Sequence, residues 1–151
     1  MSREAVRRRD HQPLRILLVE DNDDDVVMLL EAFAGVPLVR LDTVRDGEEA
    51  LAYLRREGKH KNAGLPGLLL LDIKMPKKDG FGVLREMKAD PALRHVPVIV
   101  LTTSSREEDI VRSYVEGACS YLQKPVGLTS LQNMARQLAA YWTELARVPT
   151  A

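Results

Sequence analysis

Residues 67–76 read GLLLLDIKMP, with four consecutive leucines directly before an aspartate. An apolar run of this length without a polar residue predicts a strand that is buried on both faces, as the strands of parallel sheets are. The run stops at Asp72, so the predicted strand carries this carboxylate at its carboxyl end. We therefore interpret the rest of the chain around a buried central strand that ends in an acid.

Short apolar runs alternate with longer amphipathic stretches on both sides of this strand. The strands that we predict cover 14–19, 38–44, 67–71, 98–101 and 118–122, and the helices cover 26–33, 48–57, 79–90, 107–116 and about 129–146. Parallel neighbours need crossover connections, which helices supply. The pattern predicts an α/β fold in which a doubly wound, five-stranded parallel sheet carries helices on both faces.

Composition narrows the class of protein. The chain has 151 residues with 22 basic and 22 acidic side chains, which suits a single domain and gives no overall field for holding nucleic acid or an anionic membrane. Cys119 is the only cysteine, which excludes an intrachain disulfide and a cysteine-rich zinc site. The apolar runs are far shorter than the ~18 residues of a membrane-spanning helix, and the N-terminus lacks the apolar core of a signal peptide. We expect a cytoplasmic protein that binds neither DNA nor membranes.

Polar side chains follow four of the predicted strands. They are Glu20 and Asp21, then Asp72, Thr102 and Lys124. Open parallel sheets place their chemistry outside the carboxyl ends of the strands, so these groups are expected to meet at one edge. Carboxylates brought together repel each other unless a cation neutralises them, and oxygen ligands favour Mg²⁺. Lys124 and Thr102 could then hold the oxygens of a phosphoryl group, with Asp72 as the nucleophile.

Four motifs resemble the receiver domains of two-component response regulators, in the order and spacing of that family. They read VEDN at 19–22, LDIKMP at 71–76 followed by Asp79-Gly80, VLTTS at 100–104, and GACSYLQKP at 117–125. The resemblance covers about residues 14–147. It implies a flavodoxin-like (βα)5 fold with strand order 2-1-3-4-5.

The resemblance also implies a chemistry. Asp72 would accept a phosphoryl group from the phosphohistidine of a sensor histidine kinase. Glu20, Asp21 and Asp72, together with the main-chain carbonyl of Lys74, would hold Mg²⁺. Lys74 stands two residues after the acceptor, where it could pair with phosphoryl oxygens or obstruct the attack of water, so the phosphoryl lifetime is left open.

The resemblance also implies roles for residues on and after the last two predicted strands. Lys124 and Thr102 would contact the phosphoryl group. Thr102 and Tyr121 match the switch pair of the family, in which movement of the hydroxyl lets the aromatic ring turn inward. The Lys124-Pro125 peptide bond is expected to be cis, as is usual in the family.

The organisation that we expect is a receiver domain at 14–147, a flexible basic tail at 1–13, a short tail at 148–151 and no output domain. The loop at 62–67 resembles that of stand-alone receivers paired with phytochrome-like sensor kinases. Phosphorylation would then be detected by a partner or by a second copy. Apolar residues of the last helix support a homodimer or complete the core: Tyr141, Trp142 and Leu145.

Other classes of protein fit the residues less well. A flavin mononucleotide binder of similar fold needs an anion-friendly first loop, whereas residues 20–25 would repel phosphate. Neither glycine-rich nucleotide motif occurs, and a haloacid-dehalogenase-like phosphatase needs a second aspartate where Lys74 stands. We expect no conventional substrate turnover. The alternative that stays open is a receiver-like interaction module whose binding is independent of phosphorylation.

Overall fold

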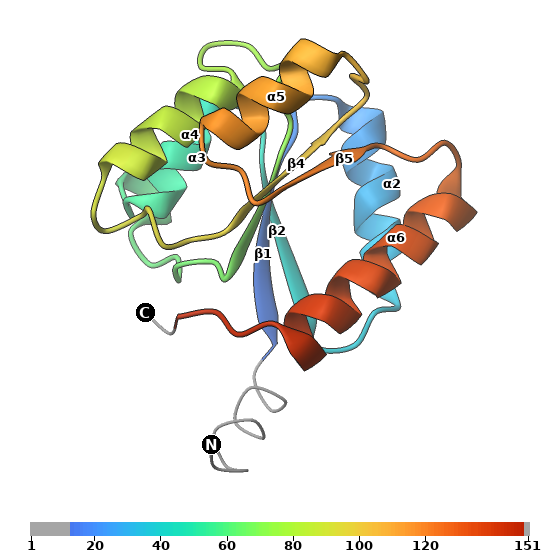
Figure 1. Ribbon diagram of the computed structural model, residues 1–151. Helices are drawn as coiled ribbons and strands as arrows, with labels where there is room; N and C mark the ends of the chain where they lie inside the picture. Colours follow the sequence, from blue (N-terminus) through green and yellow to red (C-terminus); the bar gives the residue numbers. More distant parts are fainter. Residues whose placement is uncertain (1–12, 150–151) are drawn as a thin grey trace.

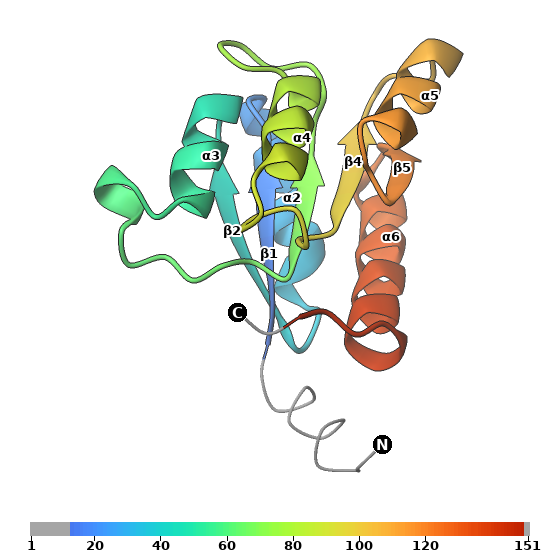
Figure 2. The same ribbon diagram turned by 60° about the vertical axis from the view of Figure 1, so that its left-hand side comes forward.

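The computed structural model describes residues 13–149 and contains one parallel sheet (Figure 1). Its strands are β1 (Leu14–Val19), β2 (Val39–Val44), β3 (Leu68–Leu71), β4 (Val98–Thr102) and β5 (Ser120–Gln123). They are arranged in the order β2-β1-β3-β4-β5, and every neighbouring pair is parallel, so all the arrowheads in Figure 2 point to the same edge of the sheet. The predicted fold class and strand order are confirmed. The predicted N-terminal tail lies, apart from Pro13, outside the described residues.

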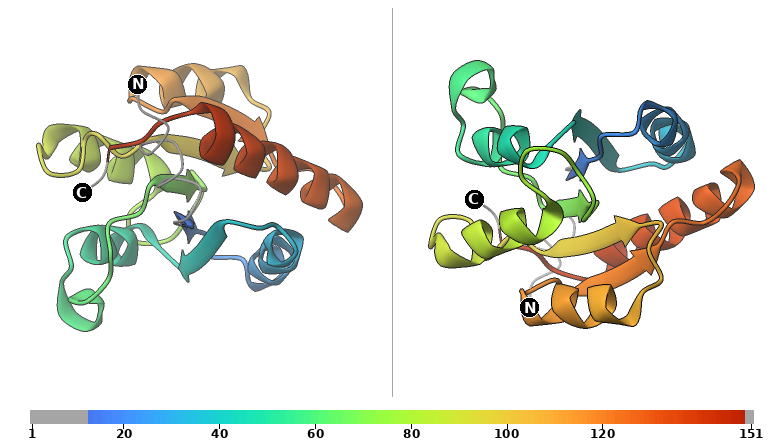
Figure 3. Two further views of the ribbon diagram at one scale, coloured as in Figure 1. Left: turned by 90° about the horizontal axis from the view of Figure 1, so that it is seen from below. Right: turned by 90° about the horizontal axis from the view of Figure 1, so that it is seen from above.

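Helices cover both faces of the sheet (Figure 3). They are α2 (Asp23–Ala34), α3 (Gly47–Leu54), α4 (Gly80–Ala89), α5 (Glu107–Val115) and α6 (Leu128–Ala140), with a 3-10 turn η1 (Gly58–His60) and a π-helical turn η2 (Tyr141–Leu145). One face is covered by α2 and α6, and the other by α3, α4 and α5. Within residues 13–149, no helix has both the length and the apolar character that a membrane span requires.

The central strand β3 supplies both cores. Its side chains alternate, so Leu69 and Leu71 pack with α3 and α4 while Leu68 and Leu70 pack with α2 and α6. All four leucines have an exposed fraction of 0%. Burial on both faces fixes the position of the residue that follows the strand, which is Asp72.

Helix boundaries differ from the predicted ones where the local chemistry overrides the apolar spacing. Helix α2 starts at Asp23, three residues early, because the Asn22 side chain accepts a hydrogen bond from the backbone N–H of Asp25 and caps the helix. Helix α3 ends at Leu54 instead of 57, and Arg56 then adopts a left-handed φ of 57° that no α-helix continues through. At the C-terminus, the regular helix stops at Ala140, and the chain widens into the π-helical turn η2.

Candidate functional site

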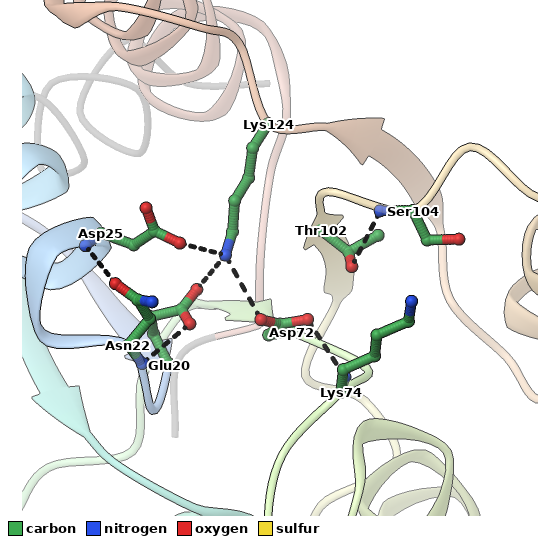
Figure 4. Close-up of polar contacts among 8 residues, drawn as sticks. All are labelled: Glu20, Asn22, Asp25, Asp72, Lys74, Thr102, Ser104 and Lys124. Carbon is green, nitrogen blue, oxygen red and sulfur yellow. Dashed lines mark hydrogen bonds and ion pairs between the residues drawn. The ribbon is translucent and has the colours of Figure 1, made fainter.

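The carboxyl edge of the sheet brings most of the predicted site residues together (Figure 4). Glu20 and Asp21 follow β1, Asp72 follows β3, and Lys124 follows β5. Because β1 and β3 are neighbours in register, with Val19 opposite Leu71, the acids that follow them lie side by side. Glu20 and Asp72 are buried, whereas Asp21 is exposed.

The Lys124 ammonium lies among three carboxylates. Its Nζ donates to Asp25 Oδ2 at 2.9 Å and to Asp72 Oδ2 at 3.3 Å, and it forms an ion pair with Glu20. Only 8% of the lysine side chain is exposed. Asp25 is a residue that the sequence interpretation missed, although it lies in the same acidic run as Asp21.

Negative charge exceeds positive charge at this edge. Burial raises the pKa of Glu20 to about 7, although the hydrogen bond from Lys124 opposes the shift. Burial alone would lower the pKa of Lys124, but its hydrogen bonds to Glu20 and Asp25 and the charge of Asp72 raise it above the ordinary value. One ammonium is therefore shared among more carboxylates than it can neutralise.

The residues present fit a hard divalent cation. Carboxylate oxygens of Glu20, Asp21 and Asp72 all lie within 4.8 Å of one another. These are the oxygen ligands that Mg²⁺ prefers, and within residues 13–149 this is the one such cluster of potential ligands. The uncompensated charge around Lys124 gives a cation a further reason to bind. The part assigned to the Lys74 carbonyl stays a prediction.

The second oxygen of Asp72 is held by the backbone. Asp72 Oδ1 accepts a hydrogen bond from the N–H of Lys74 at 3.1 Å. The chain then turns tightly against Gly80, where a Cβ atom would lie 2.5 Å from the carbonyl oxygen of Asp72. Only glycine fits there, so α4 begins in close contact with the backbone of Asp72.

Thr102 and Tyr121 are linked through Ser104. Thr102 is fully buried at the end of β4, and its Oγ1 accepts a hydrogen bond from the N–H of Ser104 at 3.4 Å. Tyr121 donates its hydroxyl to the carbonyl oxygen of Ser104 at 2.8 Å, and Ser104 Oγ donates to Asp109 Oδ2 at 2.7 Å. The hydroxyl of Thr102 thus lies beside the site without contacting Asp72 (Figure 4). Ser104, which the sequence interpretation did not single out, connects it to α5 and to Tyr121.

The expectation of a cis Lys124-Pro125 bond is wrong for this structure. Residues 13–149 contain no cis peptide bond, so the bond is trans. The trans form is intrinsically favoured before proline by about 0.5–1 kcal/mol. Lys124 is aimed by its contacts with Glu20, Asp25 and Asp72, which are made in the trans form.

The sequence model of the response regulator receiver domain matches residues 16–136. The chain belongs to this family. The match begins within β1, includes the other four strands and continues into α6. This confirms the resemblance on which the assignment of the site was based.

Similar proteins of known name indicate which receiver domains this chain resembles. Response regulator Rcp1 from Synechocystis sp. is 39% identical over 140 residues, which cover 92% of this chain and 95% of Rcp1. The structure of the phosphorylated cyanobacterial phytochrome response regulator RcpA is 43% identical, with a TM-score of 0.85 over 91% of this chain and 99% of RcpA. The Mn²⁺-bound form of Rcp1 is 39% identical, with a TM-score of 0.83 over 91% of this chain and 100% of Rcp1. This receiver domain is therefore similar to regulators associated with phytochromes.

Proposed function

We propose that this receiver domain accepts a phosphoryl group on Asp72 from a sensor histidine kinase, in a reaction that depends on Mg²⁺. The observation that supports this most strongly is the environment of the Asp72 carboxylate. One oxygen faces the Lys124 ammonium at 3.3 Å, and the other is held by the N–H of Lys74 at 3.1 Å. The relatives add that RcpA has been crystallised phosphorylated and Rcp1 with Mn²⁺ bound.

The chemistry is a transfer between two nucleophiles. A carboxylate oxygen of Asp72 attacks the phosphorus of phosphohistidine, a P–O bond forms, the P–N bond breaks, and the imidazole nitrogen keeps the electron pair. Lys124 holds a fixed positive charge beside the incoming oxygens, and Thr102 offers a hydroxyl from the neighbouring strand. A Mg²⁺ ion held by Glu20, Asp21 and Asp72 would supply the charge that lets an anionic phosphoryl group approach a carboxylate.

The donor has an open approach to the site. A hollow of about 420 Å³ lies next to the acidic cluster, and its charged lining is three acids and three bases: Asp21, Asp79 and Asp109, with Lys74, Arg106 and Arg112. The hollow gives a donor room beside Asp21 without a net charge of either sign in its lining. We propose a sensor kinase of the phytochrome-like class as the donor, because the similar protein RcpA is a phytochrome response regulator. The kinase domain and this protein would both lie in the cytoplasm.

The test uses the intact mass of the protein after incubation with acetyl phosphate, with Mg²⁺ or with a chelator. We expect a Mg²⁺-dependent gain of one phosphoryl group in the wild type and in the control Asp24→Asn, whose side chain is exposed on α2. Asp72→Asn is expected to gain none. An equal gain in Asp72→Asn, or none in the wild type, would favour the module whose binding is independent of phosphorylation.

We also propose that phosphorylation acts through self-association, with residues 14–147 as the receiver domain. Tyr141 and Leu145 at the end of the last helix are 51% and 75% exposed, whereas Trp142 packs partly into the core. Val115 on α5 adds another apolar side chain, 78% exposed. Light scattering over a range of concentrations tests this. A monomer at every concentration, with and without the phosphoryl group, would exclude the homodimer.

A further inference from the structure

The three carboxylates around Lys124 are of two kinds. Glu20 and Asp72 belong to the cluster that fits a divalent cation, whereas Asp25 lies outside that cluster. Figure 4 shows Asp25 and Asp72 approaching the ammonium from different sides, one from α2 and one from the end of β3. Asp25 is therefore the partner of Lys124 that a bound cation leaves free.

A bound cation changes what holds the lysine. A Mg²⁺ ion held by Glu20 and Asp72 would weaken their attraction for the Lys124 ammonium, and its charge would repel the ammonium. A lysine side chain has four rotatable bonds, so an ammonium without a partner leaves its position readily. The contact with Asp25 Oδ2 at 2.9 Å, a charge-assisted hydrogen bond, remains available.

The position of Asp25 is set by the start of α2. Its backbone N–H donates to Asn22 Oδ1 at 3.0 Å, which fixes the first turn of the helix directly after the acids at 20–21. The Asp25 side chain is 35% exposed, so it is less desolvated than the buried side chains of Glu20 and Asp72. Asp25 thus offers Lys124 a carboxylate at a fixed place beside the metal cluster.

We propose that Asp25 is a positioning residue for phosphoryl transfer, which keeps the Lys124 ammonium beside Asp72 while Mg²⁺ occupies the acidic cluster. This rests on the proposed function of Asp72 as acceptor. Without Asp25, Lys124 pairs only with Glu20 and Asp72 and competes with Mg²⁺ for both. Loss of Asp25 therefore weakens Mg²⁺ binding, and it slows transfer at saturating Mg²⁺ because the ammonium is held less firmly.

The experiment compares Asp25→Asn with Asp24→Asn, a matched control that removes the same charge from the neighbouring exposed position. Calorimetry with Mg²⁺ alone gives the Kd, and the intact mass with acetyl phosphate at saturating Mg²⁺ gives the rate of phosphoryl uptake. We expect Asp25→Asn to raise the Kd for Mg²⁺ about fivefold, and to slow uptake by a similar factor. Asp24→Asn is expected to change each value less than twofold, since exposed charges are screened. Asp25→Ala serves as a second neutral variant if Asp25→Asn does not fold.

A double-mutant cycle shows whether Asp25 acts through Lys124. In the Lys124→Met background, Asp25→Asn is expected to change the Kd for Mg²⁺ no more than Asp24→Asn does. The proposal is overturned if Asp25→Asn matches Asp24→Asn in the wild-type background, or if its effect persists without the lysine. A wild type that binds Mg²⁺ but gains no phosphoryl group would refute only the proposed function. The calorimetric cycle would still show whether Asp25 affects Mg²⁺ binding through Lys124.

Discussion

Strands β3 and β5 each end in a residue of the site, yet their surroundings differ. All four leucines of β3 are fully buried, with helices packed on both faces. Strand β5 lies at the edge of the sheet, where Ser120, Tyr121 and Leu122 are half-buried and Gln123 is exposed. The proposed acceptor Asp72 thus follows a strand in which every residue is buried, whereas Lys124 follows a strand in which none is.

This difference suits the roles that we propose for the two residues. An acceptor has to present its oxygens in one orientation, to which the packing of β3 and the hydrogen bond from the Lys74 N–H contribute. A lysine at the end of a less buried strand depends on its own contacts for its position, which Asp25 and the two buried acids supply. An edge strand with half-buried side chains opens locally at a lower free energy than a central one.

The largest effect is expected from a cavity in the central strand. Leu70→Ala should lower the free energy of unfolding by about 4 kcal/mol, while Leu122→Ala in β5 should lower it by about 2 kcal/mol, because a half-buried site loses fewer contacts. Urea unfolding measures both. Equal losses would contradict the contrast between centre and edge.

The next effect concerns the charge at the end of β5. Lys124→Met should lower the free energy of unfolding by about 3 kcal/mol in the presence of a chelator, because Glu20 and Asp72 stay buried without their counter-ion. Mg²⁺ is expected to restore most of the loss, and to stabilise this variant more than the wild type. Thermal unfolding with Mg²⁺ or chelator tests this, with Lys61→Met in an exposed loop as the control. Equal stabilisation of variant and wild type by Mg²⁺ would contradict the shared use of these carboxylates.

A smaller effect is expected from the Tyr121 hydroxyl, which forms a hydrogen bond between β5 and the loop after β4. Tyr121→Phe removes the 2.8 Å hydrogen bond to the Ser104 carbonyl and should cost about 1 kcal/mol in urea unfolding. Tyr141→Phe, at a residue 51% exposed, is the matched control and should change little. A Tyr121→Phe variant as stable as its control would show that this bond does not hold the edge.

At the opposite edge of the sheet, β2 takes part in a comparable hydrogen bond, whose contribution to stability depends on pH. Tyr53 donates its hydroxyl to Asp42 Oδ2 on β2 at 2.6 Å, and burial together with this bond raises the pKa of Tyr53 from 10.0 to about 12. A raised pKa means that the folded protein binds the proton more tightly, so this stabilisation is complete below pH 10 and is lost as the pH rises to about 12. Tyr53→Phe should cost about 1 kcal/mol near neutral pH.

Urea unfolding at several alkaline pH values measures the dependence. The wild type should lose more stability than Tyr53→Phe between pH 10 and about 12. Parallel curves for the two proteins would show that the phenol of Tyr53 does not contribute.

The sheet and most of its acidic edge could be predicted from the sequence because apolar runs mark buried strands and each run ends at a polar residue. Leu68–Leu71 followed by Asp72 is the clearest case. The contact between Asp25 and Lys124 could not, because it depends on how the first turn of α2 lies against the end of β5. The π-helical turn is likewise an outcome of packing, since no local pattern distinguishes it from an ordinary helical turn. The expectation of a cis Lys124-Pro125 bond came from the resemblance to the family, and the intrinsic preference of the bond is trans.

The strand order has a consequence for how the chain reaches this structure. Strand β1 lies between β2 and β3, so one of its backbone edges has no partner until the leucines at 68–71 have been synthesised. Closing a parallel pair across such a long stretch of chain costs loop entropy before any contact is gained, which slows folding. A nascent chain that ends after α3 would present the exposed edge of β1 to other chains. When β3 pairs with β1, the unpaired edge passes to β3 and then to β4, so on the ribosome this side of the sheet is complete only when β5 has been added.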